Sequence, residues 1–225
     1  SEWTNKDVTI TFTAHDEGGG GVKGIIKPDG TFVTAESTTY TVGSNGTYTF
    51  MVEDNAGNQA VIPVNVTNID KIAPTGIGTL SPSEWTNKDV TITFTAHDEG
   101  GSGVKGILKP DGTWTSADSS LNGPDGSISV FTTEYTVSSN DMYNFTVEDN
   151  AGNQAVIPVN VANIDKILPS GLFTPEFSNW TKNDISVEFN PSDEGGSGVK
   201  QWRYRISDDN GITWQSWSDY IIGDT

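Results

Sequence analysis

The sequence predicts an all-β protein built from β-sandwiches placed end to end. Three observations predict this fold class: a composition rich in turn and strand residues, internal repetition, and alternation of apolar and polar residues. The 225 residues include 25 Gly, 10 Pro, 7 Trp, 6 Tyr and 9 Phe, although hydrophobic residues make up only 33% of the chain. Frequent turn residues beside strand-forming aromatics favour many short strands over helices.

Internal repetition is the strongest feature of the sequence. The segment SEWTNKDVTITFTAHDEGG begins at Ser1 and again at Ser83, and a diverged copy begins at Ser178. The segment VEDNAGNQAVIPVNV begins at Val52 and again at Val147. Both ends of the chain are those expected of a piece of a longer array. We predict three domains: repeat 1 (1–72, without its first strand), repeat 2 (73–167, with a loop inserted near 118–129) and repeat 3 (168–225, without its last strands).

Each repeat consists of short segments that alternate apolar and polar residues. In the first segment, Val8, Ile10 and Phe12 alternate with threonines, as expected of a half-buried strand. Six or seven such strands in about 80 to 95 residues are typical of an immunoglobulin-like β-sandwich. The strands expected in repeat 1 are 8–14, 22–27, 31–34, 38–42, 47–52 and 60–66.

Several motifs resemble a known family. WTNKDVTITFTA, DEGGSGV and VEDNAGNQA, followed by the linker NIDKIAPT, resemble the bacterial immunoglobulin-like repeats of large surface and secreted proteins. The segment GVKQWRYRISDDNGITWQSWSDY of repeat 3 is similar to a variant of this family with a hairpin before an aromatic-rich strand. The resemblance implies tandem immunoglobulin-like β-sandwiches, strung as extracellular stalks that often support adhesins or enzymes at the cell surface.

Charge and composition argue against several function classes. The chain carries 12 Lys+Arg against 30 Asp+Glu, a formal charge of −18, so a nucleic-acid partner is not expected. Membrane insertion is not expected either, because no apolar run approaches the roughly 20 residues that span a bilayer. Cysteine is absent and His occurs only at His15 and His97, which excludes disulfides, thiolate metal sites and His-rich zinc centres. Catalytic motifs are also absent, so we expect no enzyme.

Acidic loops converge in the predicted topology. The loops 15–21 and 54–58 would lie at one pole of repeat 1, and the linker that enters the next repeat would reach the same pole of that repeat. This placement brings Asp70 and Asp165 close to acidic loops of the repeats that follow. Converging carboxylates suit Ca²⁺, which takes 6 to 8 oxygen ligands. The candidate ligands are Asp70, Asp98, Glu99, Asp149, Asn150, Asp165, Asp193, Glu194, Asp16, Glu17, Asp54 and Asn55.

Two simpler interpretations of these acids remain open. In the first, the acids only solvate turns, and Asp54 and Asn55 form an Asx turn. In the second, Lys71 and Lys166 supply the compensating charge in place of a cation.

Aromatic residues recur at one position, just before the second strand of each repeat. Trp3, Trp85 and Trp180 are either a sugar-stacking platform or structural residues, which cap the end of the sandwich or contact the next repeat. Their recurrence favours the structural interpretation. Repeat 3 adds Trp202 and Tyr204 on one strand face, with Arg203 and Arg205 on the other, and further aromatics at Trp214, Trp217 and Tyr220. An exposed aromatic row would indicate carbohydrate binding.

These observations favour a non-catalytic structural stalk or spacer of an extracellular, adhesin-type bacterial surface protein, with Ca²⁺ stiffening the junctions between repeats. The expected partners are neighbouring repeats, other copies of the protein, or a glycan or host surface. Two alternatives are a filament completed by strand exchange between chains and a carbohydrate-binding accessory module. An isopeptide bond between Lys23 and Asn65 is a further, weaker hypothesis based on residue type alone.

Overall fold

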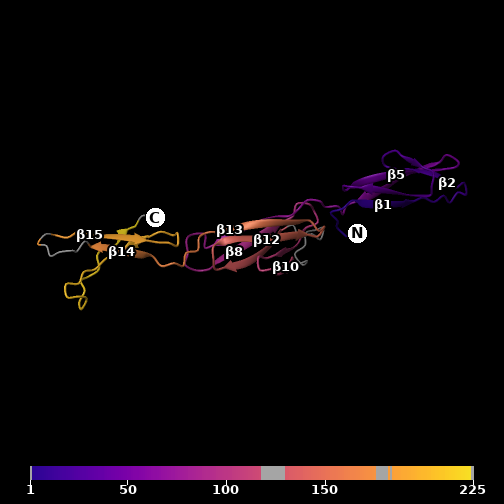
Figure 1. The fold of residues 1–225 in the computed structure, drawn as a ribbon. Coiled ribbons are helices and arrows are strands. Elements are labelled where there is room, and N and C mark those ends of the chain that lie inside the picture. The colour runs from indigo at the N-terminus through magenta and orange to yellow at the C-terminus, as the bar shows by residue number, and fades with distance from the viewer. Residues whose placement is uncertain (1, 118–129, 176–181, 183, 224–225) are drawn as a thin grey trace. The chain divides into compact units, whose positions relative to one another are not determined.

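The computed structural model describes residues 2–117, 130–175, 182 and 184–223 (Figure 1). The described residues form strands, turns and loops without a helix, so the predicted all-β class is confirmed. In this part of the chain, no helix long and apolar enough to cross a membrane is found. The loop expected near 118–129 and Trp180 lie outside the described residues.

The chain divides into two compact units. Unit 1 comprises Ser1–Gly78, Thr93–Glu134 and Tyr143–Val159, and unit 2 comprises Thr79–Ile92, Tyr135–Met142 and Asn160–Thr225. These bounds cut across the repeats read from the sequence, so the three domain ranges stay predictions.

Repeat 1 forms two antiparallel sheets, of order β1-β4 and β3-β2-β5-β6. The longest pairing joins β5 to β6, from Gly46↔Val66 to Glu53↔Gln59, across the turn at 54–58. Alternate, apolar side chains of β1 and β5 face inward. There the rings of Phe12 and Phe50 stack with their centroids 4.5 Å apart. The strands are β1 (Val8–Thr13), β2 (Val22–Ile26), β3 (Phe32–Val33), β4 (Ser37–Val42), β5 (Gly46–Asp54) and β6 (Gln59–Val66), close to the predicted positions.

Repeat 2 has the same plan with one additional strand. Its sheets have the orders β11-β8-β7 and β10-β9-β12-β13, and Phe94 stacks on Phe145 at 4.3 Å. The strands are β7 (Thr75–Ser81), β8 (Val90–His97), β9 (Val104–Leu108), β10 (Trp114–Ser116), β11 (Val130–Val137), β12 (Asp141–Asp149) and β13 (Gln154–Val161). Strands β8 and β12 carry the same motifs as β1 and β5, and they end at the acidic loops.

Repeat 3 contributes four strands to the described part: β14 (Ser170–Pro175), β15 (Val187–Ser192), β16 (Gln201–Trp202) and β17 (Ile221–Ile222). They pair as β14-β15 and β16-β17. Phe189 contacts Phe173 and Trp202 at centroid distances of 4.6 and 4.8 Å, and none of these three rings is fully buried.

The two acidic loops of a repeat lie side by side, as predicted from the antiparallel strand directions. In repeat 1, Asn55 donates its backbone N–H to Gly21 O at 3.1 Å and its side-chain amide to Gly20 O at 2.8 Å. In repeat 2, the side-chain amide of Asn150 donates to Ser102 O at 2.8 Å. Each pair of loops is therefore fixed as one surface at the end of its sheets.

Candidate metal centre

The linker after β6 is held so that Asp70 has a fixed position. Thr4 forms a parallel bridge with the linker: its N–H donates to Asn68 O and its carbonyl accepts from Asp70 N–H, both at 2.9 Å. The side-chain amide of Asn45 donates to Ile69 O and accepts from Ile69 N–H, both at 2.8 Å. Because four hydrogen bonds fix residues 68–70, the carboxylate of Asp70 projects from an ordered backbone.

Asp98 closes the glycine-rich loop that follows β8. Its Oδ1 accepts from Gly100 N–H at 3.1 Å, and its Oδ2 accepts from Gly103 N–H at 2.6 Å. The hydroxyl of Ser102 lies 3.5 Å from Oδ2. This Asx-type arrangement follows from the DEGGSG sequence, since glycine leaves the backbone free to turn around the carboxylate.

Asp149 ends β12 and organises the turn before β13. Its Oδ1 accepts from Asn153 N–H at 2.8 Å, and its Oδ2 accepts from the side-chain amide of Asn153 at 2.7 Å. The other contact of that amide is Asp70 O, at 2.9 Å. Asn153 therefore connects the turn of repeat 2 to the linker.

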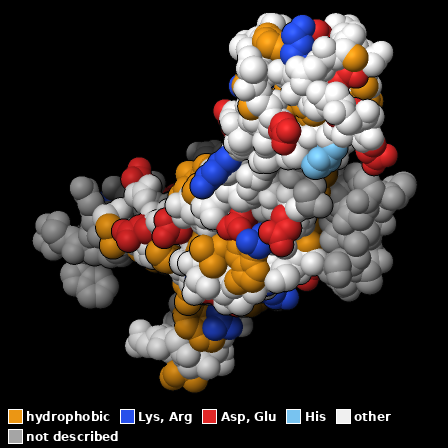
Figure 2. Space-filling model, turned by 90° about the vertical axis from the view of Figure 1, so that its right-hand side faces the viewer, with side chains coloured by type: hydrophobic (Ala, Val, Ile, Leu, Met, Phe, Trp, Pro, Cys, Tyr) orange, Lys and Arg blue, Asp and Glu red, His pale blue; other side chains and the backbone are white. Residues whose placement is uncertain are grey.

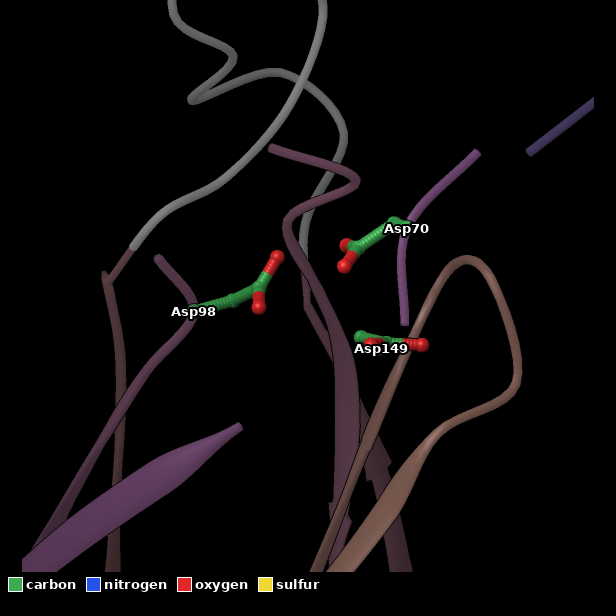
Figure 3. Close-up of side chains that lie close together, drawn as sticks. All are labelled: Asp70, Asp98 and Asp149. Atoms are coloured by element: carbon green, nitrogen blue, oxygen red, sulfur yellow. The ribbon is translucent and has the colours of Figure 1, made fainter. Parts of the chain in front are cut away.

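The linker and the two loops bring three carboxylates together. One oxygen each of Asp70, Asp98 and Asp149 lies within 4.8 Å of the others. Figure 3 shows the three side chains converging from the linker, the loop after β8 and the end of β12. All three residues are buried, with exposed fractions of 2%, 5% and 0%. The predicted proximity of Asp70, Asp98 and Asp149 is thus present in the structure.

A glycine in the loop provides the space that Asp70 occupies. A Cβ atom on Gly100 would lie 1.9 Å from Asp70 Oδ1, which no side chain can tolerate without displacing the carboxylate. The carboxylate is held there by Ser102 N–H, which donates to its Oδ2 at 3.0 Å, and by Ile72 N–H, which donates to its Oδ1 at 3.0 Å. The loop is therefore shaped around the linker aspartate.

Three buried like charges destabilise one another. At an effective dielectric constant of about 20, two carboxylates about 4 to 5 Å apart repel by about 3 to 4 kcal/mol. Burial raises the pKa of Asp149, and the charges of Asp70 and Asp98 raise it further, against hydrogen bonds from Asn153 that lower it. A cation would remove this repulsion.

The donor set fits a hard cation. Each of the three carboxylates accepts two or three of the hydrogen bonds described above, which leaves at least one of its roughly four lone-pair sites for a metal ion. Three carboxylates with carbonyl or water oxygens match Ca²⁺ better than softer metals, since neither thiolate nor imidazole contributes to this cluster.

The lysines do not neutralise the cluster, so that interpretation is wrong. Lys71 Nζ donates to Asp7 Oδ1 at 2.6 Å, and Lys166 Nζ donates to Asp89 Oδ1 at 2.8 Å. Each lysine reaches back to the start of a strand in its own repeat, away from the acidic loops that follow.

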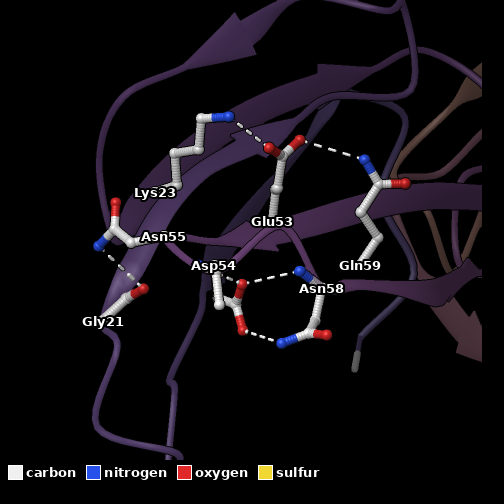
Figure 4. Close-up of polar contacts among 8 residues, drawn as sticks. Gly21, Lys23, Glu53, Asp54, Asn55, Asn58 and Gln59 are labelled. Carbon is white, nitrogen blue, oxygen red and sulfur yellow. Dashed lines mark hydrogen bonds and ion pairs between the residues drawn. The ribbon is translucent and has the colours of Figure 1, made fainter.

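In repeat 1, the loops of Asp16 and Asp54 have the same internal hydrogen bonds as the loops of Asp98 and Asp149. No counterpart of Asp70 lies beside them among the described residues. Asp16 accepts from Gly18 and Gly21 N–H at 2.9 and 2.6 Å. Asp54 accepts from Asn58 N–H at 2.8 Å and from the Asn58 side-chain amide at 2.7 Å (Figure 4). Ala56 N–H also donates to Asp54, so the predicted Asx turn is confirmed.

The electrostatic environment of Asp54 differs from that of Asp149. Hydrogen bonds from the side chain and backbone of Asn58 lower the pKa of Asp54. On the face shown in Figure 2, acidic side chains lie among uncharged ones, and some of them lie beside Lys or Arg.

Repeat 3 shows the arrangement of repeat 2 in part. Asp165 is buried, and Ser197 N–H donates to its Oδ2 at 3.2 Å. Asp193 accepts from Gly198 N–H at 2.8 Å, as Asp98 does from Gly103. A Cβ on Gly195 would lie 1.7 Å from Asp165 Oδ1, so the carboxylate of Asp165 again occupies space that exists only because the loop residue is glycine. The described part of repeat 3 offers no counterpart of Asp149 in this cluster. Hydrogen bonds from Ser197 and from Ile167 N–H lower the pKa of Asp165.

Other predicted ligands lie outside the clusters. Glu17, Glu99 and Glu194 are exposed, because each follows an inward-pointing aspartate. Asn55 and Asn150 use their amide groups to join the two loops.

Gly100, Ser102 and Asn153 were not expected to shape the site. A signal for Ser102 exists in the sequence, because repeats 2 and 3 have GGSG where repeat 1 has GGGG.

Trp3 and Trp85 each lie close to the acidic loop of the repeat that follows. A Cβ on Gly101 would lie 3.7 Å from the ring of Trp3, and one on Gly196 would lie 3.4 Å from the ring of Trp85. This geometry supports the structural interpretation of these rings. His15 and His97 are exposed loop residues.

The aromatic row of repeat 3 is interleaved with arginines. Arg203 lies 4.6 Å from the ring centre of Trp217 and 4.9 Å from that of Tyr220. Arg205 lies 4.4 Å from Trp214 and 4.8 Å from Trp217. Guanidinium groups therefore occupy ring faces on which a sugar would stack, and carbohydrate binding stays a prediction.

The isopeptide hypothesis is not supported by the strand order. Lys23 lies on β2 and Asn65 on β6, with β5 between them. Lys23 pairs with Glu53 (Figure 4), and Asn65 accepts from the hydroxyl of Thr47 at 2.7 Å.

Comparison of the chain with protein-family models and with curated proteins finds no match.

Proposed function

We propose that this chain is a non-catalytic structural segment of an extracellular bacterial surface protein, in which tandem immunoglobulin-like repeats act as a stalk or spacer stiffened by Ca²⁺. The observation that carries the proposal is the insertion of the linker residue Asp70 between Asp98 and Asp149. A cation bound there would connect the linker to the two loops that follow, and so restrict motion about residues 70–74.

Three features support a linker-centred cation site. The linker backbone is fixed by Thr4 and Asn45, the three carboxylates are buried, and no lysine in the described part neutralises them. Asp165 lies against Gly195 as Asp70 lies against Gly100, and such a recurrence is expected of a junction site that is repeated along an array. Ligand binding to the ordered state stabilises it by about 2.7 kcal/mol at a concentration 100 times the Kd.

Calorimetric titration of the whole chain with CaCl₂ tests the proposal. We expect heat of binding and a rise in Tm for the wild-type chain, and loss of the tightest site in Asp149→Asn. The matched control is Asp54→Asn, which changes the same position of the same turn sequence and should keep that site. Absence of heat and of any Tm change in the wild-type chain would overturn the cation proposal.

A further inference from the structure

Two segments of repeat 3, on either side of a turn, are held next to each other by backbone hydrogen bonds. Gln215 N–H donates to Ile206 O at 2.9 Å, and Ser218 N–H donates to Tyr204 O at 2.8 Å. Because both bonds join residues 204–206 to residues 215–218, the side chains of the two segments have a fixed register.

The turn between the segments is organised by Asp209. Its carboxylate accepts from the hydroxyl of Ser207 at 2.8 Å and from Thr213 N–H at 2.7 Å. The oxygen of Ser207 in turn accepts from Gly211 N–H at 2.8 Å. These hydrogen bonds fix the backbone directly before Trp214, so this ring also has a defined place.

Arginines and aromatic rings alternate along the two segments. The order is Trp214, Arg205, Trp217, Arg203 and Tyr220, and successive distances from guanidinium carbon to ring centre are 4.4, 4.8, 4.6 and 4.9 Å. We call these five residues the arginine ladder. Each guanidinium group contacts two rings, which restricts its rotation before any ligand arrives.

The guanidinium groups keep their hydrogen-bonding capacity. Each carries five N–H donors that need oxygen acceptors, which an aromatic ring does not supply. Among the residues that the structure describes, neither Arg203 nor Arg205 forms a hydrogen bond or an ion pair. Both residues are exposed, so the ladder presents two charged groups to solvent.

The ladder is a cationic site on an acidic chain. The only two arginines of the sequence are both in it. The acids of the same hairpin, Asp208, Asp209 and Asp219, pair with neither arginine. Since exposed charges more than about 8 Å apart are largely screened at physiological ionic strength, the distant acidic loops do not prevent an anion from binding here.

We propose that the arginine ladder binds an acidic polysaccharide, whose carboxylate or sulfate groups accept hydrogen bonds from Arg203 and Arg205. The planar fork of a guanidinium group matches the paired oxygens of such anions. Trp214, Trp217 and Tyr220 are 50%, 48% and 54% exposed, and they add apolar surface beside the charges for the C–H groups of a sugar. Because the arginines contact the rings, recognition depends on the charge of the sugar. The inference does not depend on cation binding.

Calorimetric titration of the whole chain with an oligogalacturonate tests the proposal. EDTA is present, so that no cation bridges the sugar to the acidic loops. We expect the oligogalacturonate to bind, and its fully methyl-esterified form, which has the same rings without the charge, to show no binding.

Three further probes identify the occupant. Binding of dextran sulfate but not of the oligogalacturonate would assign the ladder to sulfated sugars, within the proposal. Binding of neither anion, or equal binding of the acid and its methyl ester, would overturn the proposal. A polyglutamate peptide that binds as tightly as the sugar would assign the ladder to an acidic protein segment and also overturn it.

Substitution of the arginines separates binding from a purely structural role. Arg205→Lys keeps the charge and removes the fork, so the affinity for the oligogalacturonate should fall by about 10-fold or more, and Arg203→Lys should behave alike. The matched control is Lys200→Gln, which removes one positive charge from the same repeat outside the ladder and should leave the affinity unchanged. A lower Tm in the arginine variants with unchanged affinity would show that the ladder only stabilises the hairpin.

Discussion

The turns at 54–58 and 149–153 have the same sequence, Asp-Asn-Ala-Gly-Asn, and opposite electrostatics. Hydrogen bonds from Asn58 lower the pKa of Asp54, whereas burial and the neighbouring Asp70 and Asp98 raise the pKa of Asp149. The hydrogen bonds within the turns are alike, since the distances from Asn58 and Asn153 to the two carboxylates agree. The comparison shows that the turn geometry is local, while the behaviour of its carboxylate depends on whether a linker aspartate is seated beside it.

The largest expected effect on stability comes from substituting Gly100, whose missing side chain leaves the space that Asp70 occupies. Gly100→Ala should destabilise the fold by about 2 kcal/mol, because the new Cβ overlaps a buried, hydrogen-bonded carboxylate. Gly18→Ala, the equivalent change in repeat 1, should alter stability by less than about 0.5 kcal/mol, because only the end of the Asp16 side chain is near. Urea unfolding of both variants measures the difference, and equal effects would contradict the role given to Asp70.

A smaller effect concerns pH in the presence of EDTA. The pKa of Asp149 is raised on folding, so its contribution favours the fold at low pH and is lost as pH rises from about 4 through the folded-state pKa. The pKa of Asp54 is lowered, so its contribution is present above about pH 4 and is lost as pH falls through the folded-state pKa.

Asp149→Asn should therefore reduce the loss of stability above pH 4, and Asp54→Asn should reduce the loss below it. Urea midpoints measured from pH 3 to pH 7 test both signs. The same pH profile for the two variants would show that the linker does not distinguish the turns.

The smallest expected effect on stability comes from the Lys–Glu pairs of repeats 1 and 2, and it should be equal in the two repeats. Lys105 pairs with Glu148, and Gln154 donates to the same carboxylate, as Lys23 and Gln59 do to Glu53. An exposed pair of this kind contributes little to stability and is screened by salt. Lys105→Met and Lys23→Met should lower the urea midpoint by the same small amount, and 1 M NaCl should remove both changes. Unequal shifts would mean that the difference between the repeats extends beyond the linker.

The strands were predictable because their signals are local. Alternation of apolar and polar residues gave β1, β5 and β6, and the turn residues gave their ends. The convergence of Asp70, Asp98 and Asp149 was also predictable, because antiparallel connections place alternate loops at one end of a sandwich.

Three contributions were not predictable. The roles of Gly100 and Asn153 depend on how the linker approaches, which no local pattern encodes. The glutamates next to Asp16, Asp98 and Asp193 are exposed, and no pattern in the sequence indicates which residue of each Asp-Glu pair turns inward. The lysines were misjudged because their long side chains reach back along the linker to Asp7 and Asp89.

Carboxyl NMR titration of Asp149 and Asp54 in the same chain, with and without Ca²⁺, tests the central claim most directly. Without Ca²⁺, Asp149 should titrate above an ordinary aspartate and Asp54 below it; with Ca²⁺, the midpoint of Asp149 should fall and its resonance should shift. Two aspartates that titrate together, with no response of Asp149 to Ca²⁺, would contradict a cation site built around the linker.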